Sequence, residues 1–182
     1  MQQTSKWVFD FSHSRIGFSV RHFGITDSEG VFKKFDGNIF SNEKDFSDLA
    51  VDLTIDVSSL DTNDAQRDTH LKSEDFFYAK NFPLIAFKSS SVKVLQAGQY
   101  KIFGDLTIKN VSNSCSFDLE FTGIVPKDPF GNTKAGFLLT GKINRKDWGI
   151  NWNAALDHGG VAVADIVKIF CPIQLLKVTI PK

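Results

Sequence analysis

The sequence has no excess of charge of either sign, because 21 lysines and arginines balance 21 aspartates and glutamates over its 182 residues. A chain without a basic surface does not attract nucleic acid, so we expect no nucleic-acid partner. Apolar runs are short, and none approaches the roughly 20 residues that a membrane-spanning helix needs. The first residues show no basic segment followed by an apolar run, which predicts a cytoplasmic protein. A sequence trimmed of a signal peptide would look the same and would predict a periplasmic one.

The sequence has only two cysteines, Cys115 and Cys171, and both lie in apolar, strand-like runs. Neither has a neighbour at metal-binding or redox spacing, and the four histidines are scattered. No serine stands in a nucleophile-elbow context, and no glycine-rich phosphate loop is present. The sequence therefore predicts no metal site, no resident cofactor and no hydrolytic triad.

Phenylalanine is abundant, with 18 residues against 3 tryptophans and 2 tyrosines. Because phenylalanine carries no polar group, these rings must fill a core or line an apolar space. The length suits one buried core, and no linker or low-complexity segment divides the chain. We therefore expect a single domain over residues 1–182.

Alternating apolar and polar residues predict strands along most of the chain. Ser14–Phe23 places Ile16, Phe18, Val20 and His22 on one face, and Val31–Phe40 slips phase in a way that suggests a bulge near Asp36-Gly37. The other expected strands are Leu49–Val57, Leu84–Leu95, Tyr100–Ile108, Cys115–Phe121, Lys134–Ile143 and Val161–Val178. About eight or nine strands at hairpin spacing predict an all-β fold, either a barrel or a sandwich. Glycines within strands favour the stronger curvature of a barrel.

One helical stretch, Ser59–Pro83, interrupts the strands. Asn63 and Gln66 fit a capping box that opens a helix through Leu71. The same stretch holds Arg67, Asp68 and His70 beside apolar Leu71, Phe76 and Phe77. These residues predict either a lid whose charged side chains tie down the barrel rim, which is the commoner role, or a functional site, namely an acid/base pair or an Arg–His set that holds an anion. His22 should point inward near a strand end, where it is either a hydrogen-bonded histidine of the core, the commoner role, or a contact for the polar head of a ligand.

A series of motifs in fixed order closely resembles the YceI-like family of polyisoprenoid-binding proteins. The motifs run from Trp7 to about Val178: DFSHS at Asp10–Ser14, FSVRH at Phe18–His22, GVFKKFDG at Gly30–Gly37, RDTHLKS at Arg67–Ser73, DFF at Asp75–Phe77, FP at Phe82-Pro83, FKS at Phe87–Ser89, GDLTI at Gly104–Ile108 and NRKDWG at Asn144–Gly149. Each motif is weak alone, but their shared order and spacing are specific.

The resemblance implies an eight-stranded, lipocalin-like antiparallel barrel with a short helical lid. It also implies that the apolar lumen holds a long isoprenoid or other lipid chain. Within the family, the protein is similar to members without a signal peptide. The residues that we expect to contact such a ligand form three groups. Expected in the lumen are Phe18, Val20, Phe87, Phe117, Leu119, Phe121 and Phe137; at its mouth, Leu71, Phe76 and Phe77; and at a polar head group, His22, Arg67 and His70.

Three functions remain open at this point. The first is binding, sequestration or transport of a long apolar ligand without catalysis. The second is an enzyme that acts on an isoprenoid or small apolar substrate with His22, Asp68 or His70 as acid/base. The third is a filled barrel that serves as an interaction module, because strand faces look the same whether a lumen is empty or packed. The oligomeric state is also open, with a homodimer among the alternatives.

Overall fold

The computed structural model describes residues 5–42, 45–157 and 159–178. This part of the chain forms strands, one α-helix and two 3-10 helices. The strands are β1 (Ser5–Phe9), β2 (Ile16–His22), β3 (Thr26–Phe32), β4 (Phe35–Ser41), β5 (Ala50–Asp56), β6 (Leu60–Asp61), β7 (Leu84–Gln96), β8 (Gln99–Ile108), β9 (Val111–Val125), β10 (Lys134–Asn144) and β11 (Val163–Lys177). The helices are α1 (Ala65–Lys72), η1 (Val57–Ser59) and η2 (Arg145–Trp148).

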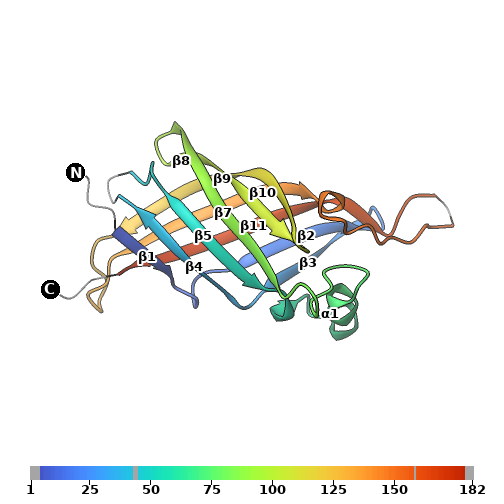
Figure 1. Cartoon of the computed structure of the whole chain (residues 1–182). Coiled ribbons are helices and arrows are strands. Elements are labelled where there is room, and N and C mark those ends of the chain that lie inside the picture. The colour runs from blue at the N-terminus through green and yellow to red at the C-terminus, as the bar shows by residue number, and fades with distance from the viewer. Residues whose placement is uncertain (1–4, 43–44, 158, 179–182) are drawn as a thin grey trace.

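The sheet closes into an antiparallel barrel of eight strands in the order β1-β4-β5-β7-β8-β9-β10-β11. Closure occurs at β1, where Trp7 is aligned with Lys177 of β11 on one side and with Ile39 of β4 on the other. The hairpin β2–β3 continues the wall beyond β1 by pairing with the other half of β11. The predicted all-β barrel is therefore confirmed (Figure 1).

The predicted strand Val31–Phe40 is wrong, because the chain breaks there into two strands. β3 ends at Phe32 and β4 begins at Phe35, and β4 runs along β5 without the expected bulge at Gly37. Phe32 and Phe35 are both buried. The phase slip in the sequence therefore arises because each strand turns its own phenylalanine inward on either side of the exposed Lys33-Lys34 link.

An aromatic cluster fills one end of the barrel. Phe46 lies 5.4 Å from Trp7, 5.2 Å from Phe121 and 5.0 Å from Phe137 between ring centroids. Trp7 has no exposed surface, and Phe46 is 2 % exposed. The start of β1 and the end of β11 lie at this end, and α1 lies at the opposite end (Figure 1).

Helix α1 confirms the predicted interruption but not its predicted cap. The N-cap is Asp64, whose carboxylate accepts a hydrogen bond from the backbone N–H of Arg67 at 3.0 Å. Asn63 instead takes a left-handed backbone with φ 60°, which asparagine tolerates well. The chain after α1 returns to extended geometry at Pro83, whose carbonyl accepts a hydrogen bond from the backbone N–H of Val57 at 2.9 Å.

Candidate ligand cavity

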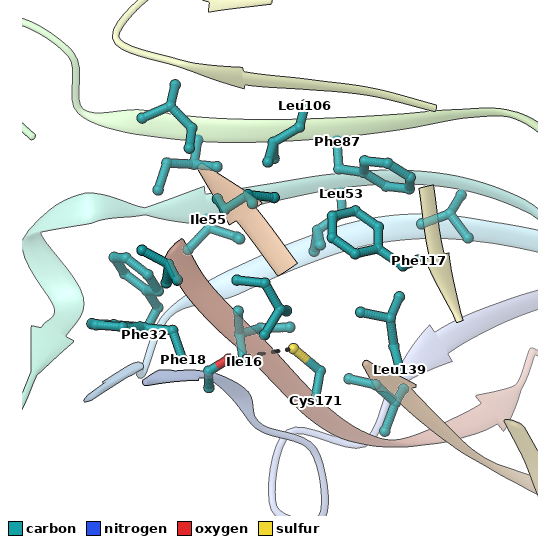
Figure 2. A pocket seen from close by; sticks show the side chains of 18 of the residues that line it. Ile16, Phe18, Phe32, Leu53, Ile55, Phe87, Leu106, Phe117, Leu139 and Cys171 are labelled. Carbon is teal, nitrogen blue, oxygen red and sulfur yellow. Dashed lines mark hydrogen bonds between the residues drawn. The ribbon is translucent and has the colours of Figure 1, made fainter. Parts of the chain in front are cut away.

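An apolar cavity of about 220 Å³ lies inside the barrel. Its wall contains aliphatic and aromatic side chains from strands all around the barrel and from the segment at α1 (Figure 2). Arg145 is the one charged residue among the described residues that line it. The lumen is therefore hollow, and it offers a ligand apolar contacts almost exclusively.

Many residues expected to contact a ligand lie at this cavity. In the wall are Phe18, Val20, Phe87, Phe117, Leu119 and Phe137, and at the α1 end are Leu71, Phe76 and Phe77. Phe121 does not line the cavity in the described part of the chain, because it packs against Phe46 and Phe137 in the aromatic cluster at the end of the barrel. The part that each residue plays in binding stays a prediction.

The segment after α1 covers one end of the cavity with aromatic rings. Phe77 packs edge-on against Phe32 of β3 at 5.8 Å between centroids, and Phe76 packs against Trp152 at 5.2 Å. Phe76 is 6 % exposed although it lies in a loop. The segment is thus held in place by its own apolar contacts, as expected for a lid.

The charged residues of the lid bind backbone and side-chain groups of Thr62. Arg67 donates from Nε to the Thr62 hydroxyl at 2.8 Å and from Nη2 to the Thr62 carbonyl at 2.7 Å. Asp68 accepts hydrogen bonds from the same residue. Neither side chain lines the cavity in the described structure. Their contacts match the interpretation in which charged lid residues tie down the rim.

The two histidines lie apart from the cavity lining as it is described. His70 Nε2 lies 2.8 Å from Asp75 Oδ2, and its ring meets Phe76 and Trp152 edge-on at 5.0 and 4.8 Å. His22 stacks on Phe23 with centroids 3.8 Å apart, at the end of β2. Within the described residues, no hydrogen bond joins His22, Asp68 or His70 to another of the three. The structure therefore assembles no acid/base pair from the side chains that the enzyme hypothesis needs.

Arg145 is the charged cavity residue that sequence reasoning missed. It is 4 % exposed and donates to four backbone carbonyls, those of Ala164 at 3.0 Å, Ile150 at 2.7 Å, Trp152 at 2.9 Å and Val163 at 3.4 Å. Burial lowers the pKa of its guanidinium, an effect that Asp165 partly offsets. Because its donors bind the carbonyls of Ile150 and Trp152 in a loop and those of Val163 and Ala164 at the start of β11, Arg145 ties that loop to the strand. The motif NRKDWG alone gave no sign that its arginine would be buried.

Cys171 also faces the cavity. Its Sγ lies 3.9 Å from the carbonyl oxygen of Gly17, to which it donates (Figure 2). Burial raises the pKa of this thiol to about 11. At neutral pH the side chain therefore behaves as a small apolar part of the wall.

None of the helices in the described residues combines the length and the apolar character needed to cross a membrane.

Comparisons with known proteins identify the chain's relatives. The model of the YceI-like domain matches residues 7–175. A UPF0312 protein of Staphylococcus aureus (strain N315) is 39 % identical over 164 residues, which cover 90 % of this chain and 93 % of the relative. The crystal structure of BcnA from Burkholderia cenocepacia has a TM-score of 0.79 at 23 % identity and covers 91 % of this chain and 98 % of its own.

A polyisoprenoid-binding domain from Saccharophagus degradans, implicated in plant cell wall breakdown, has the same fold. Its TM-score is 0.66 at 10 % identity, and the match covers 94 % of this chain and 98 % of that one. On the strength of the family match over nearly its whole length, the chain belongs to the YceI-like family.

Proposed function

We propose that this protein binds a long apolar chain, an isoprenoid or another lipid, inside the barrel and thereby sequesters or transports it. The observation that carries the proposal is the hollow lumen, whose described lining is apolar except for Arg145. Burial of apolar surface supplies about 25 cal/mol per Å², so a chain in this lumen gains affinity along its length without specific polar contacts.

Two further observations support the choice of ligand class. A protein of the same fold is described as a polyisoprenoid-binding domain. In this chain, the donors of Arg145 are directed to backbone carbonyls, which leaves the cavity with little to offer a polar group. The flexible apolar chain, and not its head group, would therefore contribute most of the binding free energy.

Binding without catalysis fits the site better than turnover. Asp68 is engaged by Thr62 and His70 by Asp75, and neither residue lines the cavity as described. A general acid or base must reach the substrate atom with which it exchanges a proton. The cytoplasmic location, the lack of a resident cofactor and the homodimer stay predictions.

The proposal is tested by extracting the purified protein with organic solvent and analysing the extract by mass spectrometry. We expect a lipid with a long apolar chain. The delipidated protein should then bind added solanesol, a polyprenol. The substitution Leu139→Trp places a larger side chain in the cavity wall and should weaken this binding, whereas Val111→Trp at an exposed strand position should not.

Circular dichroism of both variants would establish that they are folded. A protein that yields no lipid and binds no added polyprenol would contradict the proposal. Equal binding by folded Leu139→Trp and by the native protein would contradict the lumen as the binding site.

A further inference from the structure

Gly141 of β10 faces the edge of an aromatic ring of the neighbouring strand. A Cβ atom at this position would lie 2.5 Å from Cδ1 and 3.3 Å from Cε1 of Phe117 in β9. The first contact is shorter than real Cβ atoms show, and all three of the nearest atoms belong to Phe117. The ring therefore occupies the space that any other residue at position 141 would need.

The same arrangement recurs at two other inward positions of the barrel. A Cβ on Gly104 would lie 2.7 Å from Cζ of Phe87, and one on Gly30 would lie 2.8 Å from Cε1 of Phe18. Each glycine is on the strand next to its phenylalanine. Three phenylalanines of the cavity wall thus lie over glycines.

Two of these rings meet in the middle of the lumen. Phe87 and Phe117 contact each other edge-on, with centroids 5.6 Å apart (Figure 2). Along β10, Gly141 stands at the inward position between Leu139 and Ile143, and both of these line the cavity. The Phe87–Phe117 pair is therefore flanked by cavity wall on both sides.

We propose that Gly141, by leaving room for the edge of the Phe117 ring at the wall, sets the width of the lumen at its middle and so decides how long a chain can enter. This inference rests on the proposed function and adds to it the residue that selects for chain length. A ligand long enough to pass the Phe87–Phe117 pair needs the ring to stay at the wall. A ligand short enough to remain on one side does not.

The direction of the displaced ring follows from its surroundings. Phe117 is 5 % exposed and stands on the inner face of β9, so the backbone of its own sheet lies behind it. A methyl group at position 141 would displace the ring from the wall, and the cavity is the open space in front of it. The backbone at Gly141 adds no strain of its own, since its φ is not in the left-handed region.

The test compares Gly141→Ala with Gly136→Ala, the same substitution at a glycine of the same strand. At Gly136 the added methyl would lie 2.4 Å from the hydroxyl oxygen of Thr122, so it meets a side chain of β9 as closely as at Gly141 but no aromatic ring. Each delipidated protein is titrated with farnesol as a short polyprenol and with solanesol as a long one. We expect Gly141→Ala to weaken solanesol binding at least about tenfold while changing farnesol binding little, because tenfold corresponds to only about two buried methylene groups.

The double variant Gly141→Ala/Phe117→Leu provides the rescue. Leucine at position 117 removes the ring that the methyl group displaces, so solanesol binding should recover. If Gly141→Ala had weakened solanesol binding only by destabilising the protein, the second substitution would not restore that binding. Suppose that the native protein binds both alcohols. If Gly141→Ala then lowers the affinity for both equally, or for neither, the inference is overturned and the proposed function still stands. Failure of the native protein to bind either alcohol would refute the proposed function itself.

Discussion

The carboxylate of Asp68 accepts two hydrogen bonds from Thr62, one from the backbone N–H at 2.9 Å and one from the hydroxyl at 2.6 Å. Thr62 is 5 % exposed and follows strand β6, so this contact joins helix α1 to the barrel wall. Arg67 binds the hydroxyl and the carbonyl of the same threonine. Four hydrogen bonds therefore join the charged residues of the lid to Thr62, in addition to the apolar contacts of Phe76 and Phe77.

Replacing Asp68 by alanine should loosen this anchor. The buried N–H of Thr62 loses its acceptor, which costs about 1–3 kcal/mol in the free energy of unfolding. Chemical denaturation would measure that loss, and hydrogen exchange should show faster opening of α1. The control Asp75→Ala removes an exposed partner of His70 and should cost less than about 1 kcal/mol. Equal free energies of unfolding for the two variants would contradict the role of Asp68 in holding the lid.

Asp10 makes stability depend on acid pH. Burial alone would raise the pKa of its carboxyl, but hydrogen bonds from Ser12, His13, Gln174 and Lys134 outweigh burial and hold that pKa well below its ordinary value. A lowered native pKa stabilises the fold above the unfolded pKa of about 3.9, and this contribution is lost as the pH falls toward the native pKa.

Asp10→Asn should therefore unfold more easily than the native protein at pH 7, and the difference should shrink as the pH falls below about 4. Thermal unfolding followed across this range measures the effect. Asp118→Asn, at an exposed ion pair with Lys101, serves as the control and should change stability little. A difference for Asp10→Asn that stays constant with pH would contradict the assignment to the carboxylate.

Both thiols should be unreactive in the folded protein. Burial raises the pKa of Cys115 and of Cys171 to about 11. At pH 8 only about one thiol in a thousand would be the reactive thiolate. Treatment with a disulfide reagent should modify neither residue quickly in the native state and both on unfolding in denaturant. Rapid modification of Cys115, the more exposed of the two, would contradict this expectation.

Arg145→Lys should destabilise the protein despite keeping the charge. Lysine has no planar fork of donors, so some of the four backbone carbonyls, two in the loop and two at the start of β11, would lose their partner. Each carbonyl left without a donor costs about 1–3 kcal/mol. Denaturant unfolding measures the loss, and Lys146→Ala at the exposed neighbour is the control. Unchanged stability of Arg145→Lys would show that the loop does not depend on these contacts.

The sequence by itself determined the fold class, the interruption by a helix and the apolar character of the interior. Those properties depend on local patterns: the alternation at Ile16, Phe18 and Val20, and the helix-forming residues that end at Leu71. Because side chains alternate between the two faces of a strand, the sequence pattern predicts which face each side chain occupies. Short turns between such strands predict antiparallel pairing.

The tertiary structure alone decided where the barrel closes and whether its interior is hollow. Closure at Trp7 and the position of Phe117 beside Gly141 join residues that are far apart in the chain, and the burial of Arg145 depends on its contacts with the start of β11. A filled core and an open lumen have the same alternation, because only the register between strands sets which side chains fill the space. The sequence therefore predicted an apolar wall, and cross-strand packing made it a cavity.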